Sequence, residues 1–63
     1  MPALDGYVSE DELASELGVH AKTLERWRVE KQGPPHTKVG RRVMYRRASV
    51  DAWLAKREQT ALA

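Results

Sequence analysis

A chain of 63 residues can form one small domain, close to the lower size limit for a core that stands without disulfides or metals. It has no cysteine and only two isolated histidines, His20 and His36, which excludes a disulfide framework and a zinc cluster, and no apolar run is long enough to cross a membrane. We expect a single domain over residues 1–63, with its core at about 7–58, in a reducing cytoplasm and without cofactor or metal.

The net charge of +2 conceals a segregation of charge along the chain. Residues 1–19 carry −5, residues 20–47 carry +7, and residues 48–63 are neutral. Protein surfaces usually mix the two signs, so the basic middle segment favours a polyanionic partner over an idle basic surface.

The first predicted helix begins after Ser9. Ser9 and Glu12 have the spacing of a capping box, in which each side chain accepts a hydrogen bond from the other residue's backbone N–H. Val8 and Leu13 stand at the staple positions that flank such a cap, and the acids between them suit the positive end of the helix dipole. Gly18 is expected to end the helix. These acids are therefore predicted to be structural rather than catalytic.

A second helix is predicted from about Ala21. At about 100° per residue, Leu24 and Trp27 fall on one side, where we expect them to be buried. Lys22 and Arg26 then point almost the opposite way, into solvent. The end of this helix stays open over residues 29–32, and the Gly-Pro-Pro sequence that follows must stop it.

Residues 36–45 alternate loosely and predict two short strands joined by a turn at Gly40. Val43 and Tyr45 share one face of the second strand, because side chains alternate with a period of two, and we expect them to pack on the helices. Three bases at the tip of this hairpin would make a good phosphate clamp and a poor hydrophobic element. They are Lys38, Arg41 and Arg42.

A last helix is predicted over about residues 48–59, with Ser49 as a candidate N-cap or a start one or two residues earlier. Val50, Trp53 and Leu54 follow helical spacing and are expected to close the core. The fold class is therefore mainly α with a small β-hairpin: a winged helix-turn-helix of three helices and a two-stranded wing. Such a domain presents its second helix to the major groove of a DNA duplex.

The order of short motifs over residues 7–54 resembles the excisionase family, which are small winged-helix proteins related to the DNA-binding domains of MerR-type regulators. The motifs are Tyr7-Val8-Ser9-Glu10-Asp11-Glu12-Leu13-Ala14, Leu17-Gly18-Val19, Thr23-Leu24-Glu25-Arg26-Trp27, Val39-Gly40-Arg41-Arg42, Tyr45-Arg46-Arg47 and Val50-Asp51-Ala52-Trp53-Leu54. The resemblance implies a recombination directionality factor of a phage or other mobile element. Such a factor binds and bends attachment-site DNA and helps a tyrosine integrase to excise the element.

The resemblance also implies the residues that touch DNA. Lys22, Thr23 and Arg26 match the recognition-helix positions that face the major groove. The wing bases named above match the positions that contact the DNA backbone or the minor groove. Arg28 completes the predicted set, although it stands beside residues 29–35, which are longer than the family's link from helix to wing.

Further expectations concern alternative functions and self-association. A small MerR- or AlpA-like transcriptional regulator is the alternative function, but such regulators dimerise through a long coiled coil, and about nine residues follow Leu54. A basic module that docks on an acidic protein is the third hypothesis. An enzyme is not expected, because the chain has no cysteine nucleophile, no metal cluster and no glycine-rich phosphate loop. The opposite charges of residues 1–19 and residues 20–47 also predict that copies of the chain associate head-to-tail on DNA.

Overall fold

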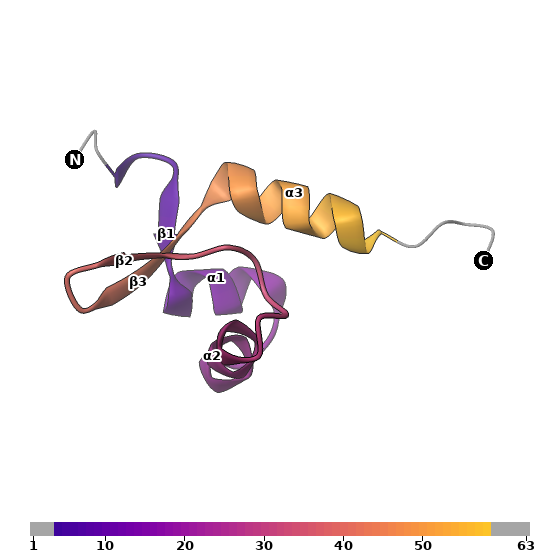
Figure 1. Ribbon diagram of the computed structural model, residues 1–63, viewed down its shortest axis with the longest axis horizontal. Helices are drawn as coiled ribbons and strands as arrows, with labels where there is room; N and C mark the ends of the chain where they lie inside the picture. The colour runs from indigo at the N-terminus through magenta and orange to yellow at the C-terminus, as the bar shows by residue number, and fades with distance from the viewer. Residues whose placement is uncertain (1–3, 59–63) are drawn as a thin grey trace.

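Three helices and three short strands make up the fold over residues 4–58, which are the residues that the computed structural model describes (Figure 1). In chain order they are β1 (Tyr7–Ser9), α1 (Glu10–Leu17), α2 (Ala21–Val29), β2 (Thr37–Val39), β3 (Arg42–Arg46) and α3 (Arg47–Arg57). The fold is a winged helix-turn-helix, as predicted, with α1 and α2 as the helix pair and β2–β3 as the wing. No helix among these residues is long and apolar enough to cross a membrane.

The start and the end of α1 are set by local contacts. The Ser9 side chain accepts from the Glu12 backbone N–H at 3.1 Å, and the Glu12 carboxylate accepts from the Ser9 backbone N–H at 3.0 Å, which confirms the capping box. Gly18 ends the helix in the left-handed region, with φ 75° and ψ 27°, where its missing Cβ removes the usual steric cost.

The end of α2, which the sequence left open, lies at Val29. Glu30 is the C-cap, and Lys31 takes a positive φ of 60°, an uncommon conformation for a residue with a side chain. The backbone N–H of Gln32 then donates to the Trp27 carbonyl at 2.7 Å, which turns the chain toward the wing. At the other end of α2, His20 is the N-cap, without a side-chain capping bond.

The sheet has one strand more than the sequence predicted. Its order is β1-β3-β2 with both pairings antiparallel, so β3 is the central strand. β1 pairs Val8 with Tyr45, across 37 positions of sequence. A three-residue strand has no usable periodicity, and its pairing depends on a distant partner, so the sequence showed this segment only as the approach to a helix.

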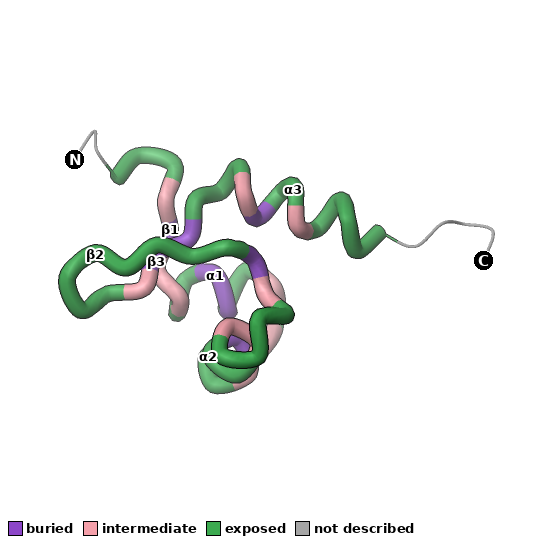
Figure 2. Tube along the Cα trace, viewed as in Figure 1, coloured by how far each residue is buried: buried purple, intermediate pink, exposed green. Residues whose placement is uncertain are grey.

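The buried core lies where β1, α1, α2 and β3 meet the first turns of α3 (Figure 2). Its members are Val8, Leu13, Ala14, Leu24, Tyr45 and Val50. Leu17, Val19, Trp27 and Val43 pack against it and are partly buried. The predicted burial of Leu24 and of Tyr45 on the inward face of β3 is therefore confirmed, whereas Val43 on the same face is partly buried.

The prediction for α3 was partly wrong. Val50 is buried, but Leu54 is 43% exposed and Trp53 is only half-buried. Trp27 of α2, which was also expected to be buried, packs beside Trp53 and is likewise half-buried. The reason is the direction of α3. It continues from the end of β3, extends away from the sheet and makes few contacts with α1 (Figure 1). Its N-cap is Arg46 rather than Ser49, without a side-chain capping bond. The predicted end at residue 59 lies outside the described residues.

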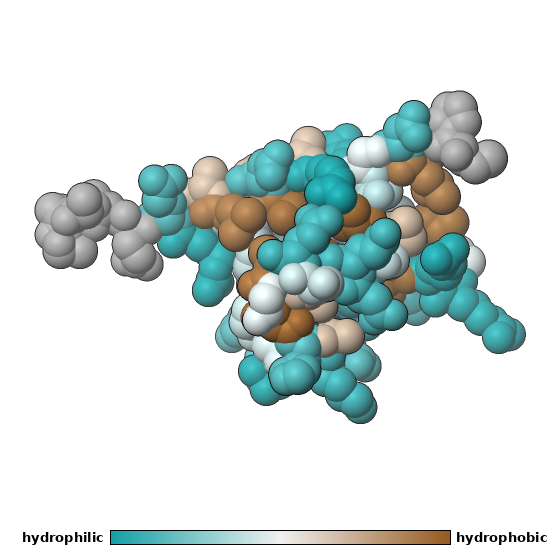
Figure 3. All heavy atoms as spheres, turned by 180° about the vertical axis from the view of Figure 1, so that it is seen from behind, coloured by the Kyte–Doolittle hydropathy of each residue, from teal (hydrophilic) through white to brown (hydrophobic). Residues whose placement is uncertain are grey.

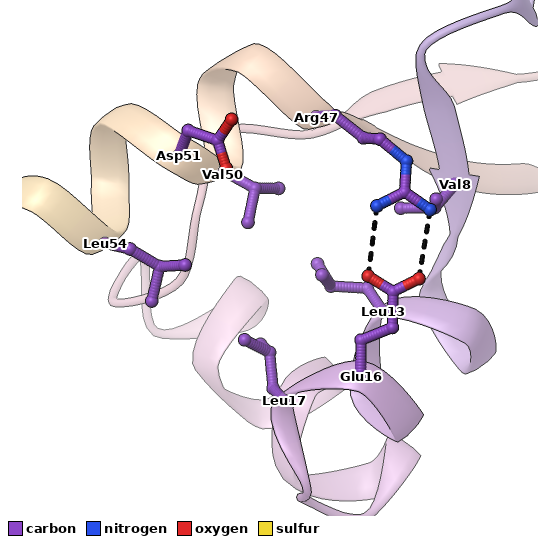
Figure 4. A pocket seen from close by; sticks show the side chains of 8 residues that line it. All are labelled: Val8, Leu13, Glu16, Leu17, Arg47, Val50, Asp51 and Leu54. Atoms are coloured by element: carbon purple, nitrogen blue, oxygen red, sulfur yellow. Dashed lines mark hydrogen bonds and ion pairs between the residues drawn. The ribbon is translucent and has the colours of Figure 1, made fainter.

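A groove of about 260 Å³ separates α1 from α3. Leu13 and Leu17 line one side and Val50 and Leu54 the other, as Figure 4 shows. From behind, apolar side chains form a band along α3 toward the middle of the molecule (Figure 3). α3 is therefore attached at its start and incompletely covered beyond it.

Candidate nucleic-acid interface

The outer face of α2 carries two exposed cations one helical turn apart. Lys22 and Arg26 stand at i and i+4, so they share a face, and neither takes part in an ion pair within residues 4–58. Glu25 and Val29 flank them, and Val29 is 69% exposed although apolar. This face contributes little to the core, and its side chains can reach a ligand without breaking an internal contact.

Thr23 lies differently from these two cations. It is half-buried, and its backbone N–H donates to the His20 carbonyl at 2.9 Å in the first turn of α2. Its side chain therefore stands at the edge of the recognition face rather than at its centre.

The wing places its three bases at an exposed tip. All of β2 is exposed, and Val39 pairs with Arg42, so Gly40 and Arg41 form a two-residue turn. Gly40 has φ 64°, the conformation that a tight hairpin turn requires and that glycine adopts readily. The predicted turn is confirmed, and the side chains of Lys38, Arg41 and Arg42 are all exposed.

A polar cleft brings the wing and the helix pair together. Its walls come from the start of α1, from α2 and from the wing, and we call it the wing cleft. It is lined by Ser9, Glu10, Asp11, Glu25, Arg28, Arg41, Arg42 and Val43. Cations from α2 and from the wing therefore border one concave surface. α2 and the wing lie on the other side of the molecule from α3 (Figure 1).

Arg28, a predicted DNA contact, is held inside the protein instead of projecting from α2. Its Nε donates to Glu10 Oε2 at 2.9 Å, and its Nη2 lies 3.4 Å from Glu10 Oε1. Tyr45 Oη donates to the same Glu10 Oε2 at 2.8 Å. Only about a fifth of either charged side chain is exposed, and Tyr45 is fully buried. We call these three side chains the polar joint, since they connect α1, α2 and β3.

The protonation of the polar joint follows from its contacts. Burial alone would raise the pKa of the Glu10 carboxyl, but the hydrogen bonds from Arg28 and Tyr45 and the Arg28 charge lower it below its ordinary value. Burial and the adjacent carboxylate raise the pKa of the Tyr45 hydroxyl, which therefore stays protonated as a donor. Sequence reasoning missed this network, because its members are 18 and 35 positions apart and no local pattern connects them.

A second ion pair lies at the groove between α1 and α3. Arg47 donates to both carboxylate oxygens of Glu16, at 3.1 and 3.0 Å (Figure 4). Both side chains are about half exposed, and the hydrogen bond from Arg47 lowers the pKa of the Glu16 carboxyl. This pair has the same chemistry as the pair of Arg28 and Glu10, but it lies outside the wing cleft.

The acidic first third of the chain is largely engaged in internal contacts. Glu10 and Glu16 hold arginines, and Glu12 closes the capping box. Asp5 and Asp11 have no ion pair among the residues that the structure describes. The charge available to a second copy is therefore smaller than the −5 of the sequence suggested.

Comparison with known proteins gives one family. A family model described as a helix-turn-helix domain matches residues 7–58, which span every helix and strand from β1 to α3. No curated protein matches the chain.

Proposed function

The chain belongs to this helix-turn-helix domain family, which is a family of DNA-binding domains, and from that premise we propose that it is a sequence-selective excisionase. In this role it binds and bends attachment-site DNA and promotes excision by a tyrosine integrase. The observation that carries the proposed DNA-binding surface is the set of exposed cations on the outer face of α2 and on the wing.

The proposed contacts follow from the positions of these side chains. Lys22 and Arg26 face the major groove from the outer side of α2, with Thr23 at the edge of the contact, and an arginine there can bond the two acceptors of a guanine. The exposed wing bases contact phosphates beside that groove and set the orientation of the domain. They are Lys38, Arg41 and Arg42.

Two arguments support an excisionase over a small transcriptional regulator. The motif order over residues 7–54 resembles excisionases, and an exposed recognition face of one short helix covers few base pairs. Bending DNA by 40–90° costs of order 1–6 kcal/mol, which favours several copies acting together with an integrase. Head-to-tail contact between neighbouring copies would be modest, because exposed ion pairs are weak and most α1 acids are already engaged.

The first experiment tests DNA binding. A specific duplex is selected from a random pool, and its affinity and that of a random duplex are measured at several salt concentrations. Log K should fall linearly with log salt, by about 0.9 for each phosphate contacted. Affinity that is unchanged over a several-fold range of salt would refute the proposal and favour the hypothesis of a basic module that docks on an acidic protein.

The second experiment separates base reading from phosphate contact. Arg26→Ala should cost roughly 1–3 kcal/mol on the specific duplex and relax selectivity, while Arg41→Ala should weaken both duplexes evenly. Lys56→Ala, an exposed cation on α3, is the control and should change neither. An excision assay with integrase and an adjacent-promoter reporter then distinguishes excisionase from regulator. Repression without any effect on excision would select the regulator.

A further inference from the structure

The polar joint lies at a place where DNA phosphates are expected. Arg28 and Glu10 both line the wing cleft, together with the wing cations Arg41 and Arg42. A cation at this position would ordinarily strengthen phosphate binding without adding sequence information. Here its Nε and Nη2 are directed at a carboxylate of the same chain.

A carboxylate and a phosphate compete for the same guanidinium, since both accept charge-assisted hydrogen bonds from its donors. Glu10 has the advantage of being fixed in position. It is the first residue of α1, the capping box of Ser9 and Glu12 holds that turn, and the buried Tyr45 hydroxyl donates to its Oε2. Arg28 therefore binds a preorganised acceptor, and a DNA phosphate must displace the Glu10 carboxylate before it can bind Arg28.

We propose that Glu10 is a specificity-determining residue that withholds Arg28 from DNA phosphate and positions α2 against the wing strand. The inference deepens the proposed DNA binding and rests on it. Because the polar joint connects α1, α2 and β3, it sets the angle at which the reading face of α2 and the wing approach the duplex together. The same contact removes one sequence-independent cation from the wing cleft.

Glu10→Gln tests this proposal, with Glu16→Gln as its matched control. Both variants remove one carboxylate from α1 that holds one arginine, and both raise the net charge by one. They differ in place, because Glu16 faces the groove beside α3. Binding to the selected and random duplexes is measured over a range of salt, at a temperature where circular dichroism shows every variant folded.

Glu10→Gln should release Arg28 and steepen the salt slope by about 0.9, the contribution of one phosphate. Affinity for the random duplex should rise and the ratio of specific to random affinity should fall, each several-fold. Glu16→Gln should leave the slope and the ratio as in the wild type. In Glu10→Gln/Arg28→Gln the slope should return to the wild-type value, which identifies Arg28 as the released cation.

Arg28→Gln alone is a second test, which does not depend on whether the Glu10 variant folds. With Arg28 withheld in the wild type, its removal should leave the salt slope unchanged and lower the ratio, since α2 loses its tether. A flatter slope in Arg28→Gln would show that Arg28 already binds phosphate and would overturn the proposal. So would a Glu10→Gln protein that behaves like Glu16→Gln. Failure of the proposed function is distinguishable, because the wild type itself would then show no salt-dependent binding.

Discussion

The helix pair and α3 are attached to the same sheet by different kinds of contact. α1 and α2 supply Leu13, Ala14 and Leu24 to the buried core, whereas α3 supplies Val50 alone. Beyond Val50, α3 is held by half-buried and exposed groups. The difference indicates that the unit carrying the recognition face depends on its own core, and that α3 can be altered with less loss of stability.

The outer contacts of α3 are aromatic and cationic. The Trp27 and Trp53 rings lie 6.2 Å apart at 44°, and the Arg57 guanidinium lies 4.9 Å from the Trp53 ring centroid. Trp53 Nε1 also donates to the Gln32 carbonyl at 3.2 Å. α3 thus closes over the link between α2 and the wing with contacts that remain partly in water.

The largest expected difference is between two leucines. Leu24→Ala should cost about 3–5 kcal/mol, because the side chain is fully buried and its loss leaves a cavity. In a domain of this size that approaches the whole free energy of unfolding. Leu54→Ala should cost less than about 1 kcal/mol, since Leu54 is 43% exposed. Urea unfolding measures both, and equal losses would remove the distinction between the two regions.

Trp53→Ala should have an intermediate effect of about 1–2 kcal/mol, from the lost ring contact with Trp27, the cation–π contact with Arg57 and one hydrogen bond. A fully buried tryptophan would cost about 3–5 kcal/mol. Thermal unfolding measures the change, and Trp53→Phe, which keeps an aromatic ring, is the control. A loss as large as that of Leu24→Ala would place α3 within the main core.

The two helix starts should respond differently to alanine. Ser9→Ala should cost about 1 kcal/mol, because it removes the acceptor for the Glu12 backbone N–H. Arg46→Ala should stay within about 0.5 kcal/mol, since Arg46 makes no side-chain cap for α3. Chemical denaturation of the two variants compares them directly. An equal cost at both positions would contradict the assignment of the caps.

Lys31→Gly should stabilise the protein by about 0.5 kcal/mol. Lys31 has φ 60°, where a side chain is strained, and the relief should exceed the entropy that glycine adds to the unfolded chain. Glu30→Gly, at φ −85°, is the control and should destabilise. A loss of stability in Lys31→Gly, measured by urea unfolding, would show that the Lys31 side chain makes a contact worth more than the strain.

The smallest expected difference is between Glu10→Gln and Glu16→Gln, in how far the stability of the protein falls at acidic pH. The pKa values of Glu10, Glu12 and Glu16 lie below their ordinary value of 4.5, so the stability that these groups contribute is present above about pH 4.5 and is lost as the pH falls through the lowered values. Glu10 is the least exposed to solvent of the three, so Glu10→Gln should flatten the pH dependence more than Glu16→Gln. Urea midpoints between pH 7 and pH 3 test this order.

The sequence by itself determined the features that depend on neighbours within a few positions. The capping box of Ser9 and Glu12, the stop at Gly18 and the hairpin turn at Gly40 are all local, and all are present. The exposure of Lys22 and Arg26 also followed from helical periodicity. Their contact with DNA is still a prediction, because periodicity specifies a face and not its ligand.

Only the tertiary structure decided how those elements meet. The contact between Arg28 and Glu10 joins residues 18 positions apart, and it makes Arg28, whose contact with DNA is still a prediction, part of an internal joint. The pairing of Val8 with Tyr45 and the direction of α3, which leaves Leu54 exposed, are equally non-local. The physical reason is that periodicity and caps fix which face of an element is apolar, whereas its direction and its polar partners depend on packing against residues that are distant in the chain.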